Sequence, residues 1–235
     1  MQNFNKISPL SLLDNAVMEI RAKILSGELR AGEWLPSERD MAAQMCISRS
    51  SLHQAILELE YQGFVKIVPR RGTRVQDFRK YPTAQSLTAL MSNESLNLEY
   101  PLFRDMMDFR LNIEGECARL ACSNIYEKTL SEMEALIEEM SLPGADFPAL
   151  AYSFHYKLTQ ASGNSLYSMV FRGFETVITN MIDRHYALCP EDIEPANQMR
   201  RELLAHIRNK NESAAAEKVR EIVSAGISVL EKKYK

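Results

Sequence analysis

The feature that most constrains this fold is a pair of short strand signals that directly follows three helical segments near the N-terminus. Apolar residues recur at helical spacing over about 12–26, 37–45 and 48–62. The segments 64–68 and 73–75 then predict two strands joined by a tight turn. This order restricts the N-terminal part to a small helical unit that a β-hairpin closes.

Serine and glycine mark the helix boundaries in this unit. Ser37 is a predicted N-cap with Asp40 three residues later, a variant of the capping box, and Ser48 is a predicted N-cap for the longer helix. Gly63 stands where a left-handed residue commonly ends a helix. The two helices that these residues delimit predict a helix-turn-helix, and the following hairpin makes it a winged one.

The rest of the chain has helical signals without strand signals. Predicted helices cover about 83–92, 102–124, 127–141, 147–162, 165–187, 195–209 and 212–233. Such helices can bury their apolar faces against one another. We therefore predict a mainly α chain, with a winged helix-turn-helix domain at 1–76, a linker at 77–82 and an all-α bundle of about seven helices at 83–235.

Composition limits the class of protein. Of the 235 residues, 46% are hydrophobic and 25% are charged, which is usual for a globular protein. No apolar run reaches the ~20 residues that a membrane helix needs, and the first residues lack the pattern of a secretory signal. The four cysteines form no C-x-x-C pair, so disulfides are not expected. We expect a cytoplasmic protein that makes no membrane contact.

The charge is unevenly distributed along the chain. The net charge of −3 argues weakly against nucleic acid, but residues 1–79 hold 11 Lys and Arg against 9 Asp and Glu. A local basic surface matters more for DNA binding than the total charge does. The N-terminal unit is therefore the candidate DNA-binding part.

The second helix of the predicted helix-turn-helix has two unlike faces. Arg49, Ser50 and His53 fall largely opposite the apolar side at 100° per residue. Such a helix enters the major groove with its N-terminal residues at base edges, where arginine can read guanine. Ser48 and Ser50 suit phosphate contacts at the helix N-terminus. The apolar side comprises Leu52, Ala55, Ile56 and Leu59.

Three further arginines flank this helix. Arg39 lies in the preceding helix and can hold a backbone phosphate or reach the groove. Arg70 and Arg71 lie at the tip of the hairpin and suit the minor groove or its phosphates. A solvated polar face is the alternative for any one of these residues, but the combined pattern favours binding to double-stranded DNA.

Four segments of the N-terminal unit carry a family resemblance. They are Leu35-Pro36-Ser37-Glu38-Arg39-Asp40, Ser48-Arg49-Ser50-Ser51-Leu52, Leu59-Glu60-Tyr61-Gln62-Gly63-Phe64-Val65 and Arg71-Gly72-Thr73-Arg74-Val75. Together they resemble the GntR family of transcriptional regulators over about 12–76. The resemblance implies that Arg39, Arg49, Arg70 and Arg71 contact an operator. Members often have arginine where this chain has His53, so the operator is expected to differ.

The predicted helix 102–124 has a charged residue inside its apolar face. Arg110 lies among apolar residues such as Phe109 and Ile113, and Glu114 follows one turn later. A charge among apolar groups is costly unless it is paired. Either a buried Arg110–Glu114 pair fixes helix packing, or Arg110 faces a cavity and binds an anionic ligand.

His155 raises the same choice between core packing and ligand binding. The segments Phe109-Arg110-Leu111-x-x-Glu114, Phe154-His155 and Ala161-Ser162-Gly163-Asn164 are similar to the all-helical, FCD-type ligand-binding domain of the FadR branch of the family. This resemblance implies a ligand near Arg110 and His155.

Three residues are further candidates for the same pocket. They are Tyr152, Asn180 and Arg184. Arg184 shares a helix side with Leu166 and Val177, which is consistent with an inward orientation.

The resemblance also bears on metal binding. Many relatives bind a divalent metal with one aspartate and three histidines, and His155 matches one of these positions. Ala151, Arg200 and Ile222 stand at the other three. One imidazole cannot hold a zinc-type ion, so we predict no metal and no other cofactor. Arg200 supplies positive charge at this place and is therefore a candidate ligand-binding residue.

These observations predict a homodimeric, DNA-binding transcriptional regulator. Its operator binding would respond to a small anionic effector, an organic acid or an acyl-type anion, in the helical domain. No G-x-S-x-G, phosphate loop or H-E-x-x-H motif is present, so an enzyme is not expected. The alternative is a DNA-binding protein whose helical domain serves only dimerisation or protein interaction, with Arg110 and His155 as core residues.

Overall fold

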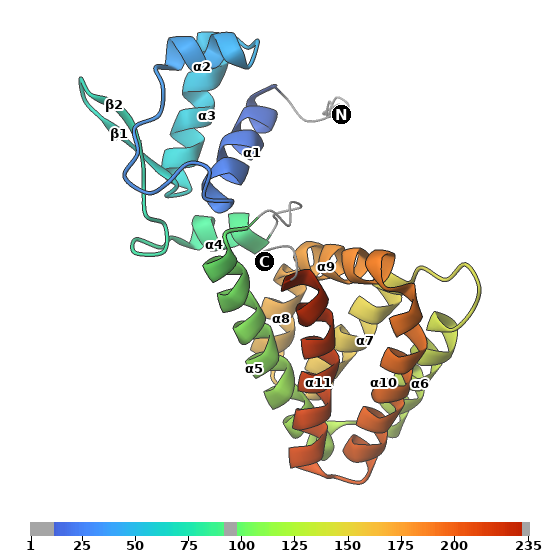
Figure 1. The fold of residues 1–235 in the computed structure, drawn as a ribbon. Helices are drawn as coiled ribbons and strands as arrows, with labels where there is room; N and C mark the ends of the chain where they lie inside the picture. The colour runs from blue at the N-terminus through green and yellow to red at the C-terminus, as the bar shows by residue number, and fades with distance from the viewer. Residues whose placement is uncertain (1–11, 92–97, 232–235) are drawn as a thin grey trace, which may run out of the picture. The chain divides into compact units, whose positions relative to one another are not determined.

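The computed structural model describes residues 12–91 and 98–231, which form two compact units divided between Glu99 and Tyr100 (Figure 1). The first unit contains the strands and a group of helices, and the described part of the second is entirely helical. The predicted helix ends at 92 and at 232–233 lie outside the described residues.

Three helices pack together at the start of the first unit. They are α1 (Leu12–Leu25), α2 (Glu38–Gln44) and α3 (Arg49–Tyr61). Both α1 and α2 contact α3. Ile20 of α1 and Ile56 of α3 are almost completely buried, so the apolar faces that the sequence predicts form the core of this unit.

Two serines start α2 and α3 as predicted. The hydroxyl of Ser37 accepts a hydrogen bond from the Asp40 N–H at 3.2 Å, and that of Ser48 accepts one from the Ser51 N–H at 3.0 Å. Gly63 has a φ of 83°, which confirms the left-handed residue predicted just after α3. Side-chain capping and one glycine therefore set the two helices of the helix-turn-helix.

The predicted hairpin is also present. Strands β1 (Val65–Val68) and β2 (Gly72–Val75) pair antiparallel, with Val65 opposite Val75. Both valines are buried, which turns one face of the hairpin toward the core of the unit. Arg70 has a φ of 63° in the connecting turn, so the chain reverses through a left-handed residue at the basic tip.

Helix α4 (Ala84–Met91) groups with the first unit, whereas the prediction placed residues 83–99 in the second domain. The hydroxyl of Thr83 donates to the Gln62 carbonyl at 3.0 Å, just beyond the end of α3. At the other side, the Glu99 N–H donates to the Leu25 carbonyl at 2.8 Å. These polar contacts hold the segment, and periodicity alone does not encode them.

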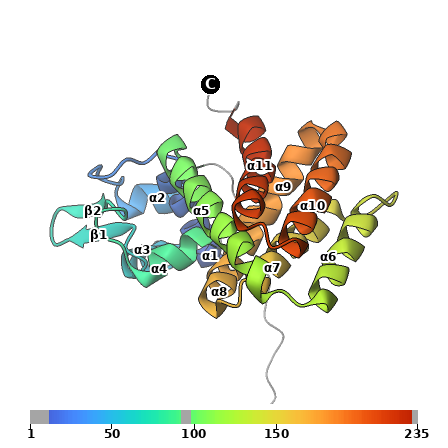
Figure 2. The ribbon, with the colours of Figure 1, turned by 90° about the horizontal axis from the view of Figure 1, so that it is seen from below.

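The second unit is a bundle of packed helices. Helices α5 and α11 lie side by side, and α7 contacts α5, α6 and α9 (Figures 1 and 2). No helix in the described ranges is long and apolar enough to cross a membrane. The elements are α5 (Tyr100–Asn124), α6 (Glu127–Met140), α7 (Phe147–Ala161), α8 (Ser165–Gly173), α9 (Glu175–Leu188), the short 3-10 helix η1 (Pro190–Asp192), α10 (Ile193–Arg208) and α11 (Glu212–Glu231).

One predicted helix is two helices. Because α8 ends at Gly173, the prediction of a single helix over 165–187 is wrong. The break lies at Phe174, whose backbone (φ −90°, ψ 9°) leaves the α-helical range. The Phe174 side chain is buried, with its ring 5.7 Å from that of Phe109. Glycine lowers helix propensity at this point, and aromatic packing favours the bend.

Two helices begin earlier than predicted. Helix α5 starts at Tyr100 and α10 at Ile193, each two residues before the predicted start. Pro101 and Pro195 therefore lie in first turns. Proline is tolerated there because the first N–H groups of a helix have no partner within the helix.

We expect Leu158→Ala to destabilise the second unit by about 2–5 kcal/mol, because it leaves a cavity in a packed core. Leu158 of α7 is 0% exposed, whereas Leu166 of α8 is 62% exposed. The matched control Leu166→Ala should change the free energy of unfolding by no more than about 0.5 kcal/mol. Denaturant unfolding followed by circular dichroism measures both, and equal effects would contradict the assigned core.

Candidate functional site

The predicted recognition face of α3 is exposed. Arg49, Ser50 and His53 all lie on the surface of the first unit. Leu52 and Ile56, on the same helix, are 0% exposed. One side of α3 therefore anchors the helix, and the other presents hydrogen-bonding groups to solvent, as the sequence predicts.

Ser48 has a structural task in addition to its predicted phosphate contact. Its hydroxyl accepts the Ser51 N–H and lies 2.9 Å from the Ser50 hydroxyl and 2.8 Å from the Ser51 hydroxyl. This cluster of hydroxyls surrounds the N-terminus of α3, where free backbone N–H groups favour an anion. Phosphate binding by Ser48 and Ser50 stays a prediction.

His53 is not a free side chain. Its Nδ1 lies 3.1 and 3.2 Å from the two carboxylate oxygens of Glu38, the first residue of α2. Sequence reasoning missed this contact, because the two residues stand 15 positions apart and nothing in the pattern of either helix sets their relative rotation.

The three flanking arginines are exposed as well. The Arg39 Nε lies 3.3 Å from the Asp40 carboxylate, and the Arg39 side chain is 77% exposed. Arg70 occupies the hairpin turn, and the Arg71 guanidinium lies 5.4 Å from the centre of the Trp34 ring. All three guanidinium groups therefore stay in contact with water.

The second unit contains a small cavity of about 30 Å³. Met107, Met181 and several aliphatic residues of α11 form much of its wall. Its polar wall consists of Arg110, His155, His185, Tyr186 and Arg200. Three predicted ligand-binding residues, one each from α5, α7 and α10, therefore meet at one cavity.

A fully buried carboxylate joins two of these residues. Glu114 accepts a hydrogen bond from the Arg110 Nε at 2.5 Å with one oxygen and contacts the His155 Nδ1 with the other. Burial by itself would raise the pKa of Glu114, but the positive charge of Arg110 and the contact with His155 lower it to about 2. Burial also lowers the pKa of His155. The buried Arg110–Glu114 pair that the sequence allowed is therefore present.

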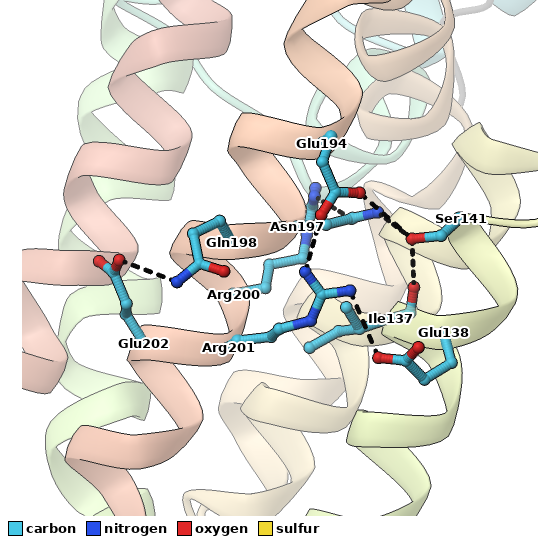
Figure 3. Close-up of polar contacts among 9 residues, drawn as sticks. All are labelled: Ile137, Glu138, Ser141, Glu194, Asn197, Gln198, Arg200, Arg201 and Glu202. Atoms are coloured by element: carbon cyan, nitrogen blue, oxygen red, sulfur yellow. Dashed lines mark hydrogen bonds and ion pairs between the residues drawn. The ribbon is translucent and has the colours of Figure 1, made fainter.

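Arg200 is held differently. It is 2% exposed, and its Nη1 donates to the Asn197 Oδ1 at 3.1 Å (Figure 3). Asn197 in turn donates to the Ser141 hydroxyl at 3.1 Å, and that hydroxyl lies 3.3 Å from the Ile137 carbonyl oxygen. A relay from the end of α6 thus orients the guanidinium through an amide and a hydroxyl, and that hydroxyl also lies 3.4 Å from a carboxylate oxygen of Glu194.

The charge of Arg200 is uncompensated by these partners. The guanidinium carbon lies 5.5 Å from the centre of the Phe147 ring and 5.8 Å from that of Phe154. In the part of the chain that the structure describes, its Nε has no hydrogen-bond partner and no carboxylate pairs with it. Burial lowers the pKa of Arg200. With Arg110 neutralised by Glu114, the wall of the cavity has a net positive charge at Arg200.

Comparison with known proteins follows this division of the chain. Residues 12–75 match the bacterial regulatory proteins of the gntR family, and residues 105–225 match the FCD domain. The second match spans more than half of the sequence. This chain belongs to the GntR family and has an FCD domain. The predicted family is therefore confirmed.

Named relatives of this GntR-family protein are transcriptional regulators. The Glc operon transcriptional activator of Escherichia coli (strain K12) is 28% identical over 174 residues, which are 69% of this chain and 65% of the activator. The match thus spans less than two thirds of that relative's length. The fatty acid metabolism regulator protein of Shewanella sp. (strain MR-4) is 26% identical over 209 residues, which are 88% of this chain and 83% of the regulator. These relatives are not enzymes, as predicted for this chain.

Solved structures share the fold. The Escherichia coli protein McbR/YncC has a TM-score of 0.52 at 16% identity, with 97% of this chain and 100% of that chain covered. Lar, which controls expression of the Listeria monocytogenes agr system, has a TM-score of 0.53 at 20% identity, with 97% and 99% covered.

Three predicted pocket residues of this GntR-family protein lie elsewhere. Arg184 is exposed on α9, so the prediction that its side chain points inward is wrong. Asn180 is partly buried outside the cavity wall. Tyr152 packs in the core, with its ring stacked 5.7 Å from Phe171, and burial raises its pKa. His185 and Tyr186 are the polar residues of α9 that face the cavity, and the His185 Nε2 lies 3.3 Å from a carboxylate oxygen of Asp192.

The cavity does not fit a metal ion. His155, Arg200 and Ile222, three of the four positions matched to metal ligands in relatives, do line the same wall. However, no group of three His, Cys, Asp or Glu side chains in the described ranges is arranged to hold a metal. The fixed positive charge of a guanidinium also opposes a cation beside it.

We expect Glu114→Gln to destabilise the protein by about 3–5 kcal/mol at pH 7, because Arg110 then lies buried without an opposite charge. The pKa of Glu114 is lowered from 4.5 to about 2 in the folded protein. The stabilisation is therefore fully present above pH 4.5 and is lost as the pH falls toward 2. The difference in unfolding free energy between wild type and variant, measured with denaturant, should shrink over that range.

Glu116→Gln is the matched control for this measurement. Glu116 is 39% exposed and pairs with Arg119 at 2.7 Å on the surface of α5. Its replacement should cost no more than about 1 kcal/mol. A similar loss for both variants at pH 7 would contradict a special role for the buried carboxylate.

Proposed function

We propose that this chain is a cytoplasmic transcriptional regulator that binds a double-stranded DNA operator through α3, α2 and the hairpin tip. Support comes from the surface of the first unit, where Arg39, Arg49, Arg70 and Arg71 are all exposed. Cations in contact with water can approach phosphates and base edges without first breaking a buried ion pair. Arg49 stands at the start of α3, the usual position for base contacts.

We further propose that an anionic effector binds in the second unit beside Arg200. The observation that supports this most directly is a buried guanidinium with neutral partners and an unpaired Nε. An unpaired buried cation is costly, and an anion that enters the cavity would offset that cost. A carboxylate suits the site because guanidinium N–H groups form charge-assisted hydrogen bonds with it.

The effector is proposed to be a small organic acid. A cavity of about 30 Å³ is far below the several hundred Å³ of a typical small-molecule site. One relative is named a fatty acid metabolism regulator and another a Glc operon activator. A long acyl chain would require much more rearrangement than a short acid, so the size favours the latter.

The proposed mechanism couples the two units through a homodimer. Two copies would present two α3 helices to a two-fold symmetric operator. The acid would prefer one arrangement of the DNA-binding units and shift the operator-binding equilibrium.

A second function retains DNA binding but gives the FCD domain only a dimerisation or protein-interaction role. The state of Arg110 favours this second function, because Glu114 already neutralises the charge of Arg110. It leaves unexplained why Arg200 is buried beside neutral groups. The two functions therefore differ in what they predict for Arg200.

Arg49→Ala should lose about 1–3 kcal/mol of specific operator binding, because a bidentate base contact is removed. The operator is first recovered by selecting a random duplex library on the wild-type protein. Affinities are then measured by fluorescence anisotropy at fixed salt. Arg208→Ala is the matched control, since Arg208 pairs with Glu127 and Glu134 on the second unit. Unchanged affinity in Arg49→Ala would show that α3 is not the recognition helix.

Arg200→Met should stay folded but lose carboxylate binding, because methionine fills the space without charge. Wild-type thermal stability should rise saturably with one member of a panel of acetate, lactate and malonate, and this rise should vanish in the variant. Arg201→Met is the control, because Arg201 pairs with Glu194 and Glu138 outside the cavity wall. A full response in Arg200→Met would contradict binding beside Arg200, and no response of the wild type to any acid in the panel would support the second function.

A further inference from the structure

The contact between α2 and α3 holds an acid against His53 on the exposed face of α3. The two carboxylate oxygens of Glu38 lie 3.1 and 3.2 Å from the His53 Nδ1. The His53 side chain is 47% exposed and that of Glu38 is 32% exposed. The Glu38 backbone is fixed by the first turn of α2, directly after the capping residue Ser37. The position of the Glu38 carboxylate is therefore set by the fold of the helix-turn-helix.

This contact decides which ring nitrogen of His53 has the proton. An ionised carboxylate only accepts hydrogen bonds, so the Nδ1 must donate to Glu38. A neutral imidazole has a single N–H. Its Nε2 is then a hydrogen-bond acceptor, and it is the nitrogen left available to a partner outside the protein.

We propose that Glu38 is a positioning residue that makes His53 a hydrogen-bond acceptor toward DNA, so that the His53 Nε2 selects the amino group of adenine or cytosine. In the major groove, adenine N6 and cytosine N4 are donors, whereas guanine and thymine present acceptors. This inference rests on the proposed operator binding through α3.

The preceding turn of α3 adds a second hydrogen-bonding side chain to the same exposed face. Arg49 lies four residues before His53 on the same exposed face and offers only donors. The face therefore presents a donor followed by an acceptor. Guanine suits the first and adenine or cytosine the second. An arginine at position 53 would instead present donors at both places and favour guanine twice.

The test is selection of duplex DNA from a random library by the full-length protein at pH 8, where an imidazole is ordinarily neutral. His53→Ala identifies the base position that His53 reads, because the preference there should fall by about fivefold or more. Glu38→Gln should replace adenine or cytosine at that same position by guanine or thymine, because the glutamine amide can donate to the Nδ1 and leave a proton on the Nε2. The base preference that is lost in Arg49→Ala belongs to a different position of the operator, and it should persist in Glu38→Gln.

Glu58→Gln provides the matched control for the selection. Glu58 is exposed on α3, and its side chain accepts a hydrogen bond from Gln62. The same change of acid to amide on the same helix should leave the selected sequence unchanged.

Nitrogen-15 NMR of histidine-labelled protein tests the tautomer without DNA. In the wild type at pH 8, the His53 signals should show a protonated Nδ1 and a bare Nε2, and His53→Ala assigns them. In Glu38→Gln the proportion of the Nε2–H form should rise. This measurement does not depend on operator affinity, so it separates the role of Glu38 from that of the operator.

Three results would overturn the inference. A wild-type His53 with its proton on the Nε2 contradicts the assigned role of Glu38. An identical selected sequence from Glu38→Gln and wild type shows that Glu38 does not set the readout. If His53→Ala leaves every base preference unchanged, His53 does not read DNA. Failure of the wild type to select any sequence would instead reject the proposed operator binding, and the inference with it.

Discussion

The carboxylate of Glu114 lies completely out of water between Arg110 and His155, and the packing of α5 against α7 depends on it. Without that negative charge, the guanidinium of Arg110 would be buried alone at a cost of several kcal/mol. With it, two polar side chains can lie inside an apolar bundle. Burial keeps His155 neutral by lowering its pKa, so the pair of ions is balanced.

Arg200 is also a buried cation, but no carboxylate of the described residues pairs with it. Its neighbours are the Asn197 amide, the Tyr186 hydroxyl and two aromatic rings, which stabilise a cation only in part. Stability alone would favour an apolar residue at this position, since methionine could fill a similar volume. A buried charge that the fold does not neutralise is most simply explained by a partner from outside the chain, and this observation supports the proposed anion site.

Much of the fold could be predicted because local signals determine it. The serine caps, Gly63 and the hairpin are encoded within a few residues each, and they lie where the sequence indicates. The break at Phe174 was missed because apolar spacing continues through it, while the bend depends on a contact with Phe109 from another helix. The grouping of α4 and Glu99 with the first unit depends likewise on hydrogen bonds to distant segments.

The candidate sites were predictable to different degrees for the same reason. The exposed face of α3 follows from one helix and its period, so Arg49 and His53 lie where expected. Neighbouring residues of a helix point about 100° apart, so an error of one residue in the predicted inward face of α9 selects Arg184 where the structure has His185. The pairing of Glu38 with His53 and the relay to Arg200 needed the relative placement of two helices, which no single periodic pattern specifies.

The charge in the cavity favours a state with a bound anion, whereas its small volume favours the empty state. The charge of Arg200 favours entry of an anion, but a cavity of about 30 Å³ is much smaller than a typical small-molecule site. Binding of the proposed effector would widen the wall, which includes the unbranched side chains of Met107 and Met181 that repack at low cost. A ligand that requires a wider cavity has by definition a higher affinity for the wider state, and in the proposed mechanism that difference in affinity would be the free energy available to change DNA binding.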